Sequence, residues 1–508
     1  MIKLKSKPML RTKPFSDVYI STGNGLIKKV LQKGFDELGG VSKFVKPGQT
    51  VLIKPNLTAG EDPITGGTTD VRLLTALVEI LQEQCEGVKL YCGENTDVGD
   101  FTMNTYDRLG YTDICRRYGV ELVDFTNTER VDISLEDAMY ADVMPFPKIV
   151  LDVDVFITLP LLKNHDTVCV TAAIKNSFGL VPDEMRRQTH RDYAIEQCLV
   201  DISRVRKPDF SIVDGRIGME GIAGGSHFDH PRYANRIVMG ADPVAVDVVC
   251  AHIMAQNPRV RYLQWADEYN LGNCNLDYIN IHGMPLKDAV VPFMTPAEEI
   301  EETTDGKIRL YDLDSCSHCR AVAQGILHRF KSGESVLKGV NIIYGPGKLD
   351  DSIEPGDRLL VGNCVREEYR SSGVYIPGCP MNRQDYFEAL TSMNIVCSIC
   401  EQEVLEFIER HTPEELAFLR ILASNKTVFK GALNNAGPTD FLLAVGDCQK
   451  YYLRHHLDRS KNEIKQRGLE DLTTADFFVK FIPGHDVTQE DLEAALSELK
   501  ERYAGWRT

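Results

Sequence analysis

The sequence has no long hydrophobic run and no apolar segment near its start. No stretch approaches the roughly 18 uninterrupted apolar residues that a membrane span needs, so we expect no membrane span. The opening residues, MIKLKSKPMLRTKPF, include basic side chains with no apolar segment behind them, and this pattern does not predict a secretion signal. We find no internal repeat and no low-complexity segment.

Basic residues are outnumbered by acidic ones: 57 lysines and arginines against 74 aspartates and glutamates give a formal net charge of −17 at pH 7. Affinity for DNA or RNA comes largely from lysine and arginine side chains that neutralise phosphates, so we expect no nucleic-acid partner. The chain contains 14 cysteines in 508 residues without the spacing of a small disulfide framework. This composition predicts a reducing, cytoplasmic location. The length is sufficient for two to four domains.

The first half alternates short β-rich apolar runs with amphipathic helical stretches, which is typical of an α/β fold. We predict a mostly parallel sheet with flanking helices, then a small α/β cysteine-containing domain, then a helix-rich C-terminal region. The corresponding boundaries are 1–290, 300–392 and 393–508, with the polar segment Pro296–Lys307 between the first two. Expected elements include strands at 50–57, 87–95, 120–125, 153–162 and 209–215, and helices at 71–84, 106–118 and 403–422.

Four cysteines in the last third of the chain have the pattern of a cluster site. Cys316 and Cys319 form a Cys-x2-Cys pair, and Cys364 and Cys379 each lie in a turn containing glycine or proline. Thiolates are the usual ligands of iron–sulfur clusters and of structural zinc. We predict a [4Fe–4S] cluster, with zinc and unliganded thiols as alternatives. The remaining cysteines of this region are interpreted as packed thiols: Cys397, Cys400 and Cys448.

Polar residues follow the predicted strand TVLIKPNL, where parallel α/β sheets bind ligands. Lys54 and Asn56 leave this strand, and a lysine in a buried strand needs an anionic partner, either a ligand or a carboxylate. The following loop, ITGGTTD, offers Thr68 and Thr69 near a helix start, where an anion could bind. A capping turn made by Thr69 or Asp70 is the alternative.

The segment LPLLKNHDTVCVTAAIKNSFGLVPDE has the densest set of candidate residues. Lys163 and His165 directly follow an apolar strand, and Lys175 and Asn176 precede an aromatic residue and a glycine. Because lysine is rarely buried without a partner, the two lysines predict a site for a small anion. His165 is the candidate acid, base or metal ligand. Nearby, His190 among arginines belongs either to an anion-binding lid or to a solvated basic loop.

The glycine-rich segment DGRIGMEGIAGGSHFDHP supplies Asp214 and Glu220 as further candidate ligand or proton-transfer groups, or as braces of a turn. It lacks both the Gly-Lys-Ser/Thr of a phosphate-binding loop and the G-x-G-x-x-G pattern before a helix. We therefore infer neither ATP nor NAD.

These motifs resemble a known family. VLIKPNL, GGTTD, LPLLKNHDTVCVTAAIKNSFGL, VDGRIGMEG and GADPVAVD together are similar to the family catalogued as domain of unknown function 362, over roughly residues 45–285. Members often carry iron–sulfur modules, so the resemblance implies that the cysteine region is such an appended module. The dense Cys-x2-Cys-x2-Cys run of bacterial ferredoxins is missing, which argues against a ferredoxin-type electron store.

The order of strand, threonine-rich turn, amphipathic helix and strand is also similar to the N-terminal domain of nickel-dependent lactate racemases. That similarity implies Lys175 or Lys163 as the cofactor tether and His165 as a metal ligand.

Our leading hypothesis is a cytoplasmic iron–sulfur oxidoreductase that acts on a small anionic substrate. A redox partner protein and a homo-oligomer are both compatible with this hypothesis. The alternatives are a lyase, a racemase or epimerase with a structural cluster, and a non-catalytic binding or assembly factor.

Overall fold

The computed structural model describes residues 2–4, 14–96, 102–222, 230–256, 260–327, 336–349, 353, 356–395, 399–423, 426–430, 441–446, 479–484 and 487–507. The chain divides into two compact units, which are described separately. The α/β unit comprises Met1–Pro296 with Asp314–Ala321, and the second unit comprises Ala297–Leu313 with Val322–Thr508. The division after Pro296 falls at the start of the polar segment that the sequence analysis took as a boundary.

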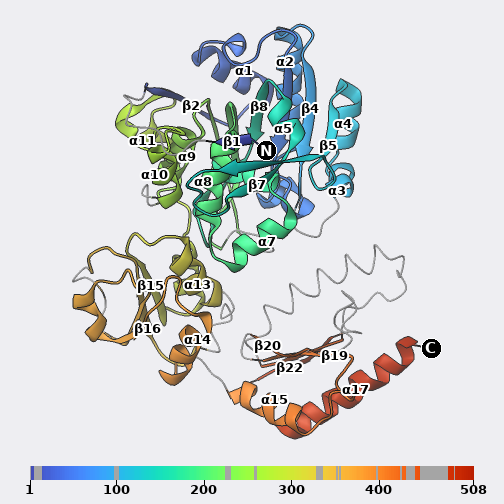
Figure 1. The fold of residues 1–508 in the computed structure, drawn as a ribbon, viewed down its shortest axis with the longest axis vertical. Coiled ribbons are helices and arrows are strands. Elements are labelled where there is room, and N and C mark those ends of the chain that lie inside the picture. Colours follow the sequence, from blue (N-terminus) through green and yellow to red (C-terminus); the bar gives the residue numbers. More distant parts are fainter. Residues whose placement is uncertain are drawn as a thin grey trace. The chain divides into compact units, whose positions relative to one another are not determined.

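A large sheet forms the centre of the α/β unit, coloured from blue to yellow-green in Figure 1. Among the described residues it has eleven strands. Its continuous path runs in the order β14 (Ile279–Gly283), β2 (Ser16–Thr22), β13 (Arg236–Gly240), β11 (Phe210–Met219), β8 (Val155–Leu159), β3 (Thr50–Pro55), β4 (Lys89–Glu94) and β5 (Glu121–Asp124). Three further strands lie off this path: β9 (Leu161–His165), β10 (Cys169–Thr171) and β12 (Pro231–Arg232).

Most neighbours in this path are parallel. Strands β8, β3, β4 and β5 pair in parallel, as do β11 with β8 and β14 with β2. Strand β13 is antiparallel to both of its neighbours, β11 and β2. The predicted fold class, a mixed α/β fold with a mostly parallel sheet and flanking helices, is therefore confirmed.

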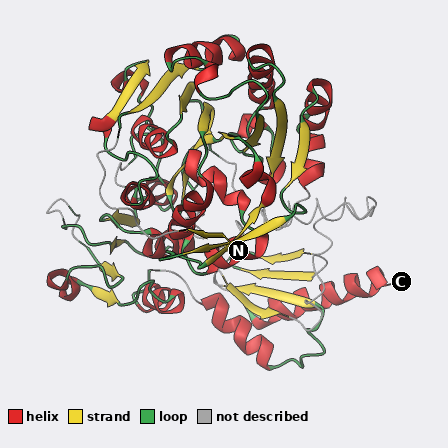
Figure 2. Cartoon of the chain, turned by 45° about the horizontal axis from the view of Figure 1, so that its top comes forward, coloured by secondary structure: helices red, strands yellow, loops and turns green. Residues whose placement is uncertain are grey.

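Helices cover both faces of the sheet, as Figure 2 shows by the red helices on either side of the yellow strands. Strand β3 explains why, since Val51 and Ile53 belong to one buried core while Leu52 belongs to the other. Successive side chains of a strand point to opposite faces, so a continuous apolar run requires cover on both. The helices of this unit are α1 (Ile27–Glu37), α2 (Val71–Gln84), α3 (Thr102–Arg108), α4 (Tyr111–Tyr118), α5 (Lys148–Asp152), α6 (Ala173–Asn176), α7 (Asp183–Arg191), α8 (Ile195–Arg206), α9 (Pro243–Ile253), α10 (Arg261–Glu268) and α11 (Leu286–Ala289).

Several elements differ from those expected from the sequence. The single helix predicted at 106–118 is divided into α3 and α4, because Gly110 adopts a left-handed conformation (φ 78°) that ends a helix. The strand predicted at 153–162 is interrupted at Pro160, which has no N–H to donate. The polar stretch that contains His190 is helix α7 rather than a loop.

The glycine-rich segment after Asp214 is likewise not a loop at its start, because β11 continues to Met219. Gly218 lies so close to the neighbouring strand that an added Cβ would be 2.3 Å from the carbonyl oxygen of Leu162. Glycine is therefore needed here for the close approach of β9 to β11. A separate small sheet is formed by β1 (Ile2–Leu4), β6 (Arg130–Leu135) and β7 (Val143–Pro147).

The second unit contains two four-stranded sheets among its described residues. The first is all parallel, in the order β15 (Ile308–Asp312), β16 (Val340–Tyr344), β17 (Arg358–Val361) and β18 (Val374–Ile376). The other has the order β20 (Lys426–Lys430), β19 (Leu419–Ala423), β21 (Phe441–Val445) and β22 (Val479–Ile482). Its helices are α12 (Pro296–Thr303), α13 (Ser317–Leu327), α14 (Arg383–Ser392), α15 (Ile399–Glu409) and α17 (Gln489–Arg507), of which α12 and α13 begin at the edge of the α/β unit.

The helix predicted at 403–422 ends at Glu409, and Leu419–Ala423 is instead strand β19. The short apolar run LRIL has the length of a buried strand as well as that of a helical turn, so periodicity alone does not separate the two. The C-terminal region thus combines helices with a sheet. In the described part of the chain, no helix has the length and apolar character needed to cross a bilayer.

Candidate functional site

Polar side chains converge on a small cavity of about 120 Å³ at the carboxyl ends of β3 and β4, which we call the first cavity. It brings together five residues predicted from the sequence: Lys54, Asn56, His165, Lys175 and Asn176. The other lining residues are Thr58, Glu94, Asn95, Thr96, Phe178, Gly179, Arg186 and His190. Lys54 and Glu94 come from the ends of β3 and β4, and α6 and α7 supply Lys175, Asn176, Arg186 and His190.

A buried ion pair between Lys54 and Glu94 forms one wall of the cavity. Their side chains are only 1% and 3% exposed. Glu94 also accepts hydrogen bonds from the backbone amides of Leu57 (3.2 Å) and Asn95 (2.9 Å). Burial lowers the pKa of Lys54, and the neighbouring Glu94 carboxylate opposes that shift. Lys54 thus has the carboxylate partner that the sequence analysis offered as one of two alternatives.

Two asparagines connect this pair to the rest of the site. The side-chain amide of Asn176 donates to the backbone oxygen of Lys54 (3.1 Å). Its oxygen lies 3.4 Å from the side-chain nitrogen of Asn56. Lys163 donates to the side-chain oxygen of Asn56 (2.9 Å) and so holds the side chain of a lining residue. Lys163 itself is not among the lining residues of the first cavity.

His165 is the last residue of β9 and is buried within the cavity wall. Its Nδ1 accepts the backbone amide of Thr167 (3.0 Å) and lies 2.8 Å from a carboxylate oxygen of Asp166. A neutral Nδ1 suits the first contact and a protonated Nδ1 suits the second. The arrangement allows His165 to exchange a proton while its ring stays in place.

We expect His165 to titrate below its ordinary pKa of 6.5. Burial is the largest cause, and the positive charge of Lys175 disfavours the imidazolium further. An NMR pH titration should give a midpoint under 6.5, and Lys175→Met should move that midpoint upward. A midpoint above 6.5 in the unaltered protein would show that Asp166 outweighs both effects.

Helix α7 contributes Arg186, which the sequence did not single out, and His190, for which an anion-binding lid was one of the two interpretations. Arg186 is almost fully buried and donates to the side chain of Asn95 (2.9 Å), the carbonyl of Thr96 (2.8 Å) and Asp183 (2.6 Å). Its Nε is buried, and the described residues offer it no hydrogen-bond acceptor. A buried donor of this kind favours a ligand or ordered water in the cavity that it lines. The composition DEMRRQTH marks α7 as polar, but no sequence signal shows which arginine points inward.

Lys175 lies beside an aromatic wall. Its Nζ is 5.6 Å from the centroid of the Phe178 ring, and the His190 ring contacts Phe178 edge-on at 5.7 Å. Burial lowers the pKa of His190 to about 4, and the positive charge of Lys175 contributes to the same shift. An added Cβ at Gly179 would lie 3.0 Å from an oxygen of Glu94, so glycine keeps this wall close to the ion pair.

The other predicted ligand residues lie elsewhere. Thr68 and Asp214 line a second cavity of about 470 Å³, where Asp214 holds Arg216 through two hydrogen bonds (2.9 and 2.7 Å). The hydroxyl of Thr69 donates to the backbone oxygen of Leu159 (2.6 Å), and Glu220 accepts the amide of Met294 (2.9 Å). Neither Thr69 nor Glu220 lines either of these cavities.

The start of α2 is capped by Asp70, whose carboxylate accepts the backbone amide of Arg72 (2.8 Å). Of the two interpretations offered for the loop ITGGTTD, this geometry corresponds to a capping turn. Thr69 and Asp70 were the two residues expected as the cap of this helix, and Asp70 is the one that caps it.

The four candidate cluster cysteines belong to both units. Cys316 and Cys319 lie at the start of α13, within the segment assigned to the α/β unit. That segment is anchored by Ser317, whose amide donates to Glu196 (2.7 Å), and by Arg320, which donates to the carbonyl of Thr167 (3.0 Å). Thr167 is two residues from His165, so this cysteine pair is held against the loop that follows the histidine.

Cys364 and Cys379 belong to the second unit, on two turns that are hydrogen-bonded to each other. The amide of Asn363 donates to the carbonyl of Gly378 (2.9 Å), and the amide of Gly378 donates to the side chain of Asn363 (2.8 Å). Cysteine sulfurs are the usual ligands of iron–sulfur clusters. In the described ranges, no three or more His, Cys, Asp or Glu side chains are grouped to hold a metal.

The cluster itself stays a prediction from the sequence. The prediction that Cys397 and Cys448 are packed thiols falls outside the described residues, as does the side chain of Cys400.

The fold and the first cavity together define an α/β protein with a small cavity, lined in part by cationic side chains, at the carboxyl edge of its sheet. Residues 51–252 match the family described as Domain of unknown function (DUF362). The predicted resemblance is thus confirmed for this range, which includes the first-cavity residues and does not extend to the four cluster cysteines.

Two further comparisons were found. The chain is 29% identical over 260 residues to "Thylakoid-associated protein sll1697" of Synechocystis sp., covering 50% of this chain and 76% of that protein. It is also loosely similar to the structure of the lactate racemase apoprotein from Thermoanaerobacterium thermosaccharolyticum, with 10% identity and a TM-score of 0.34 over 77% of this chain and 92% of that one.

Proposed function

We propose that the α/β unit binds a small anionic molecule in the first cavity and is the substrate-binding part of an enzyme. The charge of the lining carries this proposal: three cationic side chains, Lys54, Lys175 and Arg186, face the cavity together with two imidazoles and one carboxylate, Glu94, which pairs with Lys54. Arg186 is itself paired with Asp183, which is not a lining residue. Groups of one sign gathered in a low-dielectric cavity favour a ligand of the opposite sign.

The size of the cavity limits the ligand. At roughly 30 Å³ for each water molecule in the liquid, about 120 Å³ corresponds to about four waters. A carboxylate, phosphate or similar group of a few heavy atoms fits this space. Lys175 and Arg186 would bind its oxygens, and the Lys54–Glu94 pair would fix the wall against which it rests.

His165 is the proton carrier of the proposed site. Its low pKa keeps the imidazole neutral near pH 7, and a neutral imidazole can take a proton from a bound substrate. Asp166, 2.8 Å from Nδ1, would stabilise the imidazolium that results. His165 therefore suits the role of general base, with Lys175 stabilising negative charge on the substrate.

We further propose that the chemistry is redox and that the protein works in the cytoplasm. The four-cysteine pattern of Cys316, Cys319, Cys364 and Cys379 supports this, because a thiolate-held [4Fe–4S] cluster supplies one-electron transfer when bound. The loop of His165 is hydrogen-bonded to the segment that carries the first two of these cysteines. Zinc at the same residues would leave the anion site in place without electron transfer.

Replacement of Lys175 tests the anion site. We expect Lys175→Met to weaken binding of inorganic phosphate or acetate by at least about tenfold, the equivalent of about 1.4 kcal/mol, while the melting temperature changes little. Isothermal titration calorimetry and thermal unfolding measure the two quantities. Lys33→Met, at an exposed position on α1, is the matched control and should alter neither.

Two results would contradict the proposal. Unaltered protein that binds neither anion at millimolar concentration has no such site. A large fall in melting temperature in Lys175→Met would show that the lysine instead balances a buried carboxylate.

A further inference from the structure

The helix that carries Lys175 and Asn176 into the first cavity is too short to hold its own position. Helix α6 comprises only Ala173–Asn176. A single helical turn is unfavourable by itself, because several backbone angles are fixed for very few hydrogen bonds. Contacts from other elements must therefore fix α6.

Asp247, in the middle of α9, provides the principal contact at the start of α6. One oxygen of its carboxylate accepts the amide of Ala173 (2.6 Å), and the other accepts the amide of Ile174 (3.1 Å). The hydroxyl of Tyr262 on α10 lies 3.1 Å from that second oxygen. Three elements thus meet at one carboxylate, which is 0% exposed.

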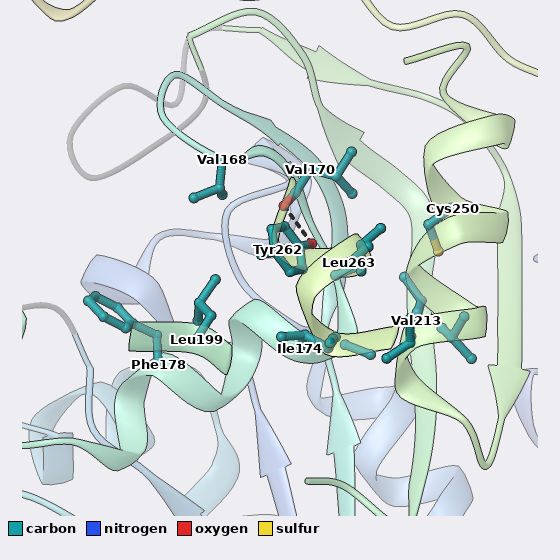
Figure 3. Close-up of a cluster of buried hydrophobic side chains, with 14 of the residues drawn as sticks. Val168, Val170, Ile174, Phe178, Leu199, Val213, Cys250, Tyr262 and Leu263 are labelled. Atoms are coloured by element: carbon teal, nitrogen blue, oxygen red, sulfur yellow. Dashed lines mark hydrogen bonds between the residues drawn. The ribbon is translucent and has the colours of Figure 1, made fainter. Parts of the chain in front are cut away.

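The surroundings of this carboxylate are apolar. Figure 3 shows Tyr262 beside Val170, Ile174 and Leu263, with its hydroxyl directed at the carbonyl of Val170. Burial raises the pKa of Asp247 to about 7. Among the described residues, no lysine, arginine or histidine forms an ion pair with it within 4.0 Å. A buried charge held only by hydrogen-bond donors has a high energetic cost, which is accepted where the geometry it imposes is needed.

The other end of α6 is attached to the cavity itself. Asn176 donates to the backbone oxygen of Lys54 (3.1 Å) and lies between the side chains of Lys54 and Asn56. Lys175 therefore sits on one turn of backbone held between Asp247 and the Lys54 strand. A shift at the start of α6 would move the Lys175 amine relative to the cavity.

We propose that Asp247 is a positioning residue of the first cavity, which sets the place of Lys175 by holding the two amides at the start of α6. This inference rests on the proposed anion site. The side chain of Asp247 is separated from the cavity by α6 itself and is not among the cavity's lining residues.

Asp247→Asn tests the proposal. An asparagine offers one oxygen where the carboxylate offers two, so its NH₂ group would face one of the two backbone amides, donor against donor. We expect the acetylation rate of Lys175 in the ligand-free protein, followed by peptide mass spectrometry, to rise, and phosphate binding to weaken at least about tenfold. Lys33 should react at an unchanged rate.

Asp201→Asn is the matched control. Asp201 is also fully buried and accepts backbone amides, those of Met139, Tyr140 and Ala141. Unlike Asp247 it also pairs with Arg204 (3.1 Å); it belongs to α8 and contacts no cavity residue through these bonds. A purely structural effect of removing a buried carboxylate should appear in both variants as a lower melting temperature. A change in Lys175 reactivity should appear only in Asp247→Asn.

A double mutant separates action through Lys175 from general loosening. If Asp247 acts through Lys175, then Asp247→Asn combined with Lys175→Met should bind phosphate no more weakly than Lys175→Met alone. Additive losses would overturn the proposal, as would unchanged Lys175 reactivity in folded Asp247→Asn.

Tyr262→Phe is used if Asp247→Asn does not fold, because it removes the hydroxyl that contacts Asp247 and the carbonyl of Val170 and keeps the ring. A smaller rise in Lys175 reactivity is then expected, and no rise would contradict the proposal. Absence of phosphate binding in the unaltered protein would refute the anion site, whereas the reactivity of Lys175 would still report on Asp247.

Discussion

Replacing Lys54 by methionine is expected to lower the free energy of unfolding of the α/β unit by about 3–5 kcal/mol, because Glu94 would be left as an unpaired buried charge. Both partners are at least 97% buried, so water cannot replace the lost ammonium group. Glu94 would keep only its two backbone donors and its hydration would not be restored. Denaturant unfolding, with hydrogen exchange used to assign the transition to the α/β unit, measures the loss.

A second substitution shows whether the unpaired charge is the cause. Lys54→Met combined with Glu94→Gln should recover part of the stability, since glutamine carries no charge. The recovery is incomplete because its single oxygen accepts only one of the two backbone amides that now donate to separate carboxylate oxygens. Lys28→Met removes one side of an exposed pair with Glu83 and should change stability little. Equal losses in Lys54→Met and the double variant would exclude the charge as the reason.

Replacing Cys364 or Cys379 by serine is expected to abolish the broad visible absorption of thiolate-ligated iron in anaerobically purified protein. Four thiolates hold the predicted cluster, and loss of one removes a quarter of its ligands and part of the folding free energy that metal binding supplies. Absorption and electron paramagnetic resonance spectroscopy test the first effect, and limited proteolysis between Asp314 and Asn382 tests the second.

The control for the cluster is Cys397→Ser, which should keep the colour. Loss of colour in that variant with retention in Cys364→Ser would identify a different set of ligands. Elemental analysis that finds zinc in place of iron would remove electron transfer from the proposed function, and the Lys175 and Asp247 predictions would be unaffected.

Local sequence patterns predicted the elements whose ends have strong chemical signals. Helix α2 runs from Val71 to Gln84 as expected, because Asp70 caps its start and its apolar residues recur at helical spacing. Asp242 caps α9 before Pro243 by accepting two backbone amides, a start signal of the same kind. Where one residue's backbone conformation decided the outcome, as at Gly110, the pattern of the surrounding residues carried too little information.

The candidate site was predictable where it follows from topology. Lys54, Asn56 and His165 end strands of a largely parallel sheet, and the carboxyl ends of such strands meet at one edge. Proximity in the sequence was less informative. Thr68, in the loop after β3, and Asp214, in the middle of β11, instead line the second cavity.

The sequence by itself determined the α/β fold class, since the alternation of apolar strands and amphipathic helices is a local property. It also determined which residues could carry charge into a buried site. Only the tertiary structure decided which charges meet. The pairing of Lys54 with Glu94 joins residues 40 positions apart, Arg186 reaches Asn95 across 91, and Asp247 holds α6 across 74. Such contacts depend on the packing of whole elements, because a side chain finds its partner only after the sheet and helices have fixed its direction.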